Sequence, residues 1–160
     1  MYLIDSDVFI DAKNRHYGFD IVPAFWEWIE QAHRAARVFT VQKVADEVLA
    51  GGDELADWMS RQPASFRLTA GSGDQPALNT VSQWATGDGY TQAAVATFLQ
   101  AADYFLVAQA LSLGYTVVTQ ETSDPAAKKR IKIPDACKAM GVSWLSPFNM
   151  LRTEGVRFVL

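Results

Sequence analysis

The sequence predicts an α/β fold in which helices cover a parallel sheet. The first run, Met1 to Ile4, is apolar on both faces, which is typical of a strand buried inside a parallel sheet. A second run, Tyr115 to Thr119, is rich in β-branched residues and predicts another strand. Helical patterns alternate with short strand patterns along the chain, and this alternation indicates a parallel α/β sheet.

Capping and breaking residues divide the first half of the chain into elements. Ser6 or Asp7 can cap a short helix, and Pro23 suits the first turn of the next one. Thr40 is a plausible cap for a third helix, which Gly51 and Gly52 would end. The expected strands are Met1 to Ile4, Arg37 to Thr40 and Phe66 to Leu68. The expected helices are Ser6 to Ile10, Pro23 to Ala36, Val41 to Ala50, Asp53 to Arg61 and Pro76 to Trp84, with a loop over Lys13 to Asp20.

The second half contains the longest helical pattern. It runs from Thr91 to Leu113 and stops at Gly114. After the Tyr115 to Thr119 strand, the chain is polar and ends in a basic run at Arg130. The remaining expected elements are strands at Ile131 to Ile133 and Val142 to Leu145, and helices at Pro134 to Met140 and Pro147 to Thr153.

Length and composition indicate one globular domain, residues 1–160, with 49% hydrophobic and 20% charged residues. The single cysteine, Cys137, excludes an intramolecular disulfide and fits a reducing cytoplasm. We expect no secretory peptide, and no apolar run approaches the ~20 residues that a membrane helix requires. The net charge of −4 argues against broad attraction to nucleic acid, although clustered acids can hold a metal that meets phosphate.

Four acids occupy positions that suggest chemistry. Asp5 follows the first strand, where sites in open α/β sheets lie. Asp103 falls within the apolar stripe Leu99, Leu106, Ala110 and Leu113. A lone buried carboxylate costs several kcal/mol, so Asp103 needs a proton, a partner or a metal. The alternative is a paired core aspartate or one at the exposed edge of the stripe.

Two further acids complete the pattern. Glu47 lies beside the apolar face of its helix, and Glu121 follows the Tyr115 to Thr119 strand, so it would emerge at the same sheet edge as Asp5. Taken alone, each is as readily a solvated acid, and Asp124 competes with Glu121. Together, the four acids offer the oxygen ligands that Mg²⁺ prefers. Two such ions about 4 Å apart would support phosphoryl transfer.

These motifs resemble the PIN-domain nucleases. The opening Tyr2-Leu-Ile-Asp5-Ser-Asp7-Val-Phe-Ile is similar to the first family motif, and Val44-Ala-Asp-Glu47-Val-Leu to the second. Ala101-Ala-Asp103-Tyr-Phe-Leu looks like the third, and Val117-Val-Thr119-Gln-Glu121 like the fourth, where the family usually has Asp. The stretch Lys132-Ile-Pro-Asp135-Ala-Cys137 is similar to one PIN-like subfamily.

The resemblance implies a three-layer α/β/α fold with about five parallel strands and metal-dependent RNA cleavage. Asp5, Glu47, Asp103 and Glu121 would hold Mg²⁺ or Mn²⁺, which would activate a water for attack on the phosphodiester. The residues implied in supporting roles are Asp7, Thr119, Asp124 and Asp135. The simpler alternative for Asp135 is a solvated acid in the first turn of a helix, and for Asp124 a turn residue before Pro125.

Substrate and partner predictions rest on weaker patterns. The only dense basic cluster comprises Lys128, Lys129, Arg130 and Lys132, which would either hold RNA phosphates beside the acids or form a solvated loop. Trp26, Trp28, Trp58 and Trp84 are read as core or dimer interface rather than as base-stacking surfaces. His16 and His33 are expected at the surface, and Cys137 in the core.

The resemblance also implies a cytoplasmic, homodimeric toxin that an antitoxin protein neutralises, with no membrane partner. Two alternatives stay open at this point. One is a catalytically inactive module that binds RNA or protein. The other is a phosphohydrolase with an aspartate nucleophile, because Asp5-Ser-Asp7 has the bare Asp-x-Asp form.

Overall fold

A computed structural model describes residues 1–160 and confirms the predicted α/β class. Five parallel strands form one sheet in the order β3-β2-β1-β4-β5. The strands are short, and their bounds are β1 Tyr2–Ile4, β2 Val38–Val41, β3 Arg67–Leu68, β4 Thr116–Val118 and β5 Trp144–Leu145. Because every pair is parallel, all five carboxyl ends lie at one edge of the sheet.

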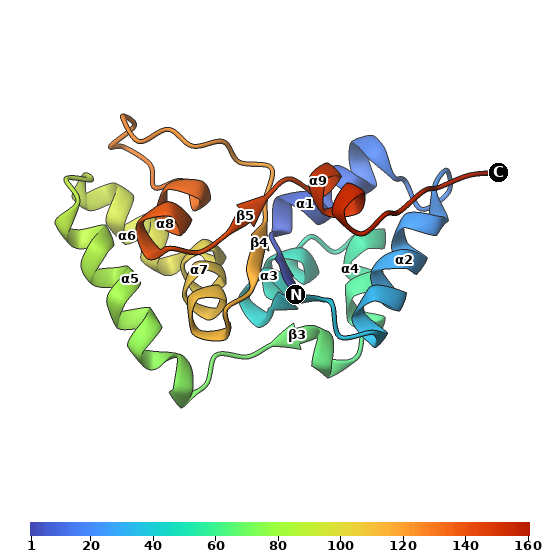
Figure 1. The fold of residues 1–160 in the computed structure, drawn as a ribbon, viewed down its shortest axis with the longest axis horizontal. Helices are drawn as coiled ribbons and strands as arrows, with labels where there is room; N and C mark the ends of the chain where they lie inside the picture. Colours follow the sequence, from blue (N-terminus) through green and yellow to red (C-terminus); the bar gives the residue numbers. More distant parts are fainter.

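Nine α-helices flank the sheet and make the fold a three-layer α/β/α structure. Figure 1 shows α5 to α8 gathered on one side of the central strands and α1, α2, α4 and α9 on the other. The helix bounds are α1 Ser6–Asp11, α2 Pro23–Arg34, α3 Gln42–Ala50, α4 Glu54–Arg61, α5 Gln75–Gly87, α6 Gln92–Gln100, α7 Ala102–Leu113, α8 Ile133–Met140 and α9 Pro147–Thr153.

The central strand β1 is buried on both faces, as its apolar sequence predicts. Leu3 and Ile4 are completely inaccessible to solvent and belong to one continuous core of 38 residues. That core includes Trp26 and Trp58, which confirms the core reading for these two tryptophans. The sheet therefore packs against a filled core, and this packing holds its carboxyl edge in place.

The longest expected helix, Thr91 to Leu113, is wrong as a single element. The chain is extended at Ala101 (φ −84°, ψ 160°), and α6 and α7 meet there at 70°. The sequence around the break is rich in helix-forming alanine, so local propensity gives no sign of it. The break frees the backbone N–H of Ala102, which donates to Glu47 Oε1 at 3.4 Å, and it puts Asp103 in the first turn of α7.

Three smaller expectations are also wrong. The expected loop after Lys13 begins with a π-helical turn, Ala12–His16, that continues α1. The expected strand at Ile131 to Ile133 does not form, because Ile133 already begins α8. Thr40 does not cap α3, since its hydroxyl donates instead to the Ile4 carbonyl of the neighbouring strand at 2.6 Å.

No single helix is long and apolar enough to cross a membrane. The bent pair α6 and α7, taken together, reaches that length and composition.

The Thr40 bond yields a test of how the sheet edge is held. Thr40 is fully buried, so Thr40→Val leaves the Ile4 carbonyl without this donor and should lower the free energy of unfolding by about 1–2 kcal/mol. Urea unfolding followed by circular dichroism measures the change. Thr69→Val, at an exposed position, is the control and should change stability by less than about 0.5 kcal/mol. A Thr40→Val protein as stable as the wild type would contradict the assignment.

Candidate functional site

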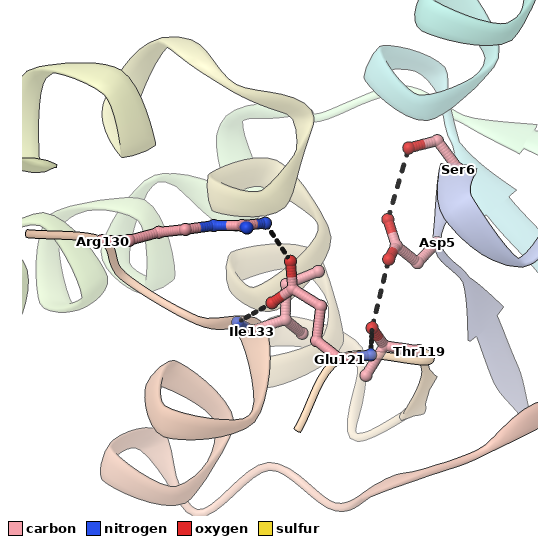
Figure 2. Close-up of polar contacts among 6 residues, drawn as sticks. All are labelled: Asp5, Ser6, Thr119, Glu121, Arg130 and Ile133. Carbon is pink, nitrogen blue, oxygen red and sulfur yellow. Dashed lines mark hydrogen bonds and ion pairs between the residues drawn. The ribbon is translucent and has the colours of Figure 1, made fainter. Parts of the chain in front are cut away.

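Asp5 is held at the carboxyl edge of the sheet by two neighbouring strands. Its backbone N–H donates to the Val118 carbonyl at 3.0 Å, which extends the pairing of β1 with β4. The Thr119 hydroxyl donates to Asp5 Oδ2 at 3.1 Å, and the Ser6 hydroxyl lies 3.4 Å from Oδ1 (Figure 2). Only 2% of Asp5 is exposed. The carboxylate is therefore oriented, yet it has no cationic partner.

Asp103 reaches the same region from the start of α7. The half-buried Asp103 side chain sits in the first helical turn, where the partial positive charge of the helix N-terminus favours a carboxylate. Glu47, exposed on α3, accepts the Ala102 N–H at the same helix end. The break at Ala101 thus brings two acids from different helices to one helix terminus.

Burial and neighbouring acids raise the pKa values of Asp5 and Asp103. Burial raises the pKa of Asp5 well above its ordinary range, and the charges of Asp103, Asp7 and Glu121 raise it further. Burial, then Glu121 and Glu47, raise the pKa of Asp103 to about 7. We call Asp5, Asp7, Glu47, Asp103 and Glu121 the acidic cluster.

Glu121 belongs to the acidic cluster by charge, but its oxygens bind elsewhere. Arg130 Nη2 donates to Oε1 at 2.7 Å, and the backbone N–H of Ile133 donates to Oε2 at 2.7 Å (Figure 2). The Thr119 hydroxyl accepts the backbone N–H of Glu121 at 3.1 Å. Glu121 therefore ties the segment from Lys128 to Lys132, which we call the basic loop, and the start of α8 to the end of β4.

The supporting acids predicted from sequence do not all lie in the acidic cluster. Asp7 is exposed on α1 and contributes its charge to the acidic cluster. Asp135 is buried, so the solvated alternative for it is wrong. Its carboxylate accepts the Ser123 hydroxyl and the backbone N–H of Asp124, whose own side chain is exposed. These two acids shape the loop after β4 and are not among the charges that act on Asp5 or Asp103.

The structure separates the four basic residues. Lys129 and Arg130 line a cavity of about 440 Å³ that Asp103 also borders. Lys128 turns away, pairs with Asp88 at 3.5 Å and lies 4.5 Å from the centre of the Tyr90 ring. Lys132 occupies the position before α8 and does not line this cavity.

Sequence reasoning missed the apolar wall of that cavity. Phe98 on α6 and Ile131 after the basic run both line it. Each is almost fully buried and looks like a core residue in the sequence, so no pattern distinguishes it.

The remaining aromatic and sulfur residues are not among the groups that shift the pKa of Asp5 or Asp103. Cys137 is buried as expected, and burial raises the pKa of its thiol to about 12. His16 is exposed as expected. His33 is half-buried and is held between the Val38 carbonyl and the Ser65 hydroxyl, so its assignment to the surface is only partly correct. Trp28 and Trp84 are half-buried against the core.

Comparison with known proteins gives one family match. The model of the family described as Domain of unknown function (DUF4411) matches residues 2–158. The chain belongs to this family. No curated protein and no solved structure matched the chain. The match covers the whole acidic cluster and the basic loop, and the family description specifies no activity.

The acidic cluster fits a divalent cation by the chemistry of its donors. Carboxylate oxygens are hard ligands, and a bound cation would offset both the burial and the repulsion that raise the pKa values of Asp5 and Asp103. No three acidic, histidine or cysteine side chains stand together in a geometry that would hold one ion. Asp5 and Asp103 are the strongest candidate ligands, with Glu47 beside Asp103.

The raised pKa values predict how stability changes with pH without metal. A carboxyl group whose folded pKa is raised binds more protons when folded, so its stabilising effect is present at low pH and is lost as the pH rises toward the folded value. For Asp103 this window runs from its ordinary value of 3.8 to about 7. In EDTA, the free energy of unfolding should therefore fall as the pH is raised from about 5 to about 8, a range that brackets the Asp103 pKa of about 7.

Replacing Asp103 with Asn should remove much of this loss. At pH 8 in EDTA, Asp103→Asn should raise the free energy of unfolding by about 1–3 kcal/mol, because it removes a buried charge from the acidic cluster. Thermal and urea unfolding at several pH values measure the effect, with Asp46→Asn on the exposed face of α3 as the control. A destabilised Asp103→Asn protein at pH 8 would contradict the electrostatic account.

Proposed function

We propose that this protein is a metal-dependent nuclease that hydrolyses RNA phosphodiester bonds. The observation that carries the proposal is the pair Asp5 and Asp103, two carboxylates from separate segments that meet at the carboxyl edge of a parallel sheet, where the charge of Asp103 adds to burial in raising the pKa of Asp5. Such a pair is unfavourable to folding unless its charge is neutralised, and a divalent cation is the ligand that such oxygens take.

The residues of the acidic cluster have distinct parts in this proposal. Asp5 and Asp103 would hold the cation, and Glu47 would add its negative charge beside Asp103. When bound, the cation would supply an activated water and charge stabilisation of the leaving oxygen. Thr119 donates to Asp5 Oδ2 and so orients the carboxylate of Asp5. The Thr119 hydroxyl is itself held in place because it accepts the Glu121 N–H. Thr119 is thus a positioning residue for Asp5.

The basic loop supports a phosphate substrate. Lys129 and Arg130 border the same cavity as Asp103, so positive charge lies directly beside the acidic cluster. Lysine and arginine at such positions bind phosphate oxygens and fix the register of a strand. RNA is proposed over DNA because of the resemblance of the four acidic motifs to PIN-domain nucleases, and the parallel sheet agrees with the fold that this resemblance implies.

The broader biological setting stays a prediction. The resemblance to PIN-domain toxins suggests a homodimeric toxin, an antitoxin protein that neutralises it and a cytoplasmic location, which also suits a single buried cysteine. A neighbouring gene for a small protein would support the toxin assignment, and sedimentation would establish the oligomeric state.

A second candidate function is an inactive module that binds RNA. The observation in its favour is that both oxygens of Glu121 are already bonded to Arg130 and Ile133, so this acid is not free to hold a cation. In the nuclease proposal, Asp5 and Asp103 hold the cation, and Glu121 instead fixes Arg130 and the start of α8. The two functions differ in whether cleavage occurs.

An RNA cleavage assay tests the nuclease proposal. Labelled single-stranded RNA should be cut in Mn²⁺ or Mg²⁺ and left intact in EDTA. Asp5→Asn and Asp103→Asn should each lower the rate by about 100-fold or more, because each removes cation-dependent stabilisation of several kcal/mol. Glu47→Gln should also lose activity, whereas its exposed neighbour variant Asp46→Asn should retain it.

The outcomes separate the alternatives. RNA binding without cleavage in any divalent metal would support the inactive module. Hydrolysis of small phosphate esters with intact RNA would support the phosphohydrolase. Cleavage that persists in both Asp5→Asn and Asp103→Asn would overturn the assignment of the acidic cluster.

A further inference from the structure

The cavity beside Asp103 has the size and position of a ligand site. Its volume of about 440 Å³ lies in the range of small-ligand pockets, about 300–1,000 Å³. One side is formed by α6, the other by the segment from Lys129 to Ile131, and Asp103 lies at its border. We call this cavity the α6 pocket. It therefore opens directly next to the acidic cluster.

Two kinds of surface meet in the α6 pocket. Phe98 and Ile131 are each 3% exposed and provide an apolar, partly aromatic wall. Lys129 and Arg130 are exposed, line the same pocket and provide two positive charges. A nucleotide combines the same two features, since its base is a flat surface that packs on aromatic and apolar groups and its phosphate is an anion.

The basic wall is fastened at both ends. The Lys128 carbonyl accepts the backbone N–H of Thr91, the residue that caps α6. At the other end, Glu121 holds Arg130 through Oε1 and the start of α8 through Oε2. Figure 2 shows the Arg130 side chain extending toward Glu121, on the opposite side of Glu121 from Asp5. The segment that carries Lys129 and Arg130 is thus fixed against α6 before any ligand binds, which lowers the entropic cost of binding.

We propose that the α6 pocket binds one nucleotide of the RNA strand, next to the phosphodiester at the acidic cluster. Its base packs against Phe98 and Ile131, and its phosphate binds Lys129 and Arg130. Glu121 is then the positioning residue that holds Arg130 in the pocket wall. This inference rests on the proposed function for the identity of the strand, but the pocket is tested by binding alone.

Two exposed alanines of α6 provide a matched pair of variants. Ala93 lines the α6 pocket, whereas Ala96 is exposed on the same helix and does not line it. Ala93→Trp should fill the pocket, and Ala96→Trp should place the same bulk outside it. Circular dichroism and thermal unfolding of both variants establish that they fold alike.

The measurement is the affinity for a short single-stranded RNA in EDTA, where no cleavage occurs. Ala96→Trp should bind like the wild type, and Ala93→Trp should bind about tenfold more weakly or worse, because one stacked base is lost. Lys129→Ala should weaken binding and reduce the salt dependence by about one phosphate contact. Nucleoside 5′-monophosphates should compete weakly, and only in proteins with an open pocket.

The failures of the two proposals are distinguishable. If Ala93→Trp loses RNA binding while no metal supports cleavage, the α6 pocket stands and the nuclease proposal fails. If Ala93→Trp and Ala96→Trp bind RNA and cut it equally well, the α6 pocket is overturned whatever the activity. Mononucleotide binding as tight as RNA binding would overturn the assignment to a strand, and no binding of either ligand by the wild type would overturn the inference altogether.

Discussion

The parallel pairing of β1 with β4 is the interaction on which the candidate site depends. It aligns Ile4 with Val118, so that the next residues along each strand, Asp5 and Thr119, lie side by side and bond to each other. A register shift of one residue would turn these side chains to the opposite face of the sheet. Such a shift is costly because it would disrupt the packing of Leu3 and Ile4, which are completely buried in the core around β1. Packing of the sheet therefore fixes the chemistry at its edge.

Much of this arrangement could be predicted from the sequence because short-range patterns determine it. The apolar run before Asp5 and the β-branched run before Thr119 specify two buried strands, and parallel pairing then brings their ends together. Asp103 was identified from an apolar stripe along one helix, and the structure keeps only part of that stripe: Leu106 and Ala110 are buried on α7, whereas Leu99 belongs to α6 and Leu113 is exposed. Its pKa of about 7, which burial and the charges of Glu121 and Glu47 raise, agrees with a carboxylate held in an unfavourable, partly buried position. Their binding of metal stays a prediction.

The features that sequence reasoning missed all depend on contacts between distant segments. The break at Ala101 is stabilised by Glu47, which lies 55 positions from its bonding partner Ala102. Glu121 looks like a free acid after a strand until the fold brings Arg130 and Ile133 to it. These two contacts change the site from four equivalent acids into two carboxylates without an ion-pair partner, Asp5 and Asp103, next to a fastened basic loop. The loop also forms one wall of the α6 pocket, so a single acid links both regions.

The central claim is that Asp5 and Asp103 share a divalent cation. Anomalous scattering from crystals grown with Mn²⁺ at about pH 8, above the pKa of Asp103, tests it most directly. The account predicts a Mn²⁺ peak bonded to carboxylate oxygens of both residues, at metal–oxygen distances of about 2.1 Å as for Mg²⁺. The same peak should be absent from Asp103→Asn crystals. Saturating Mn²⁺ with no peak between these two carboxylates in the wild type would contradict the account.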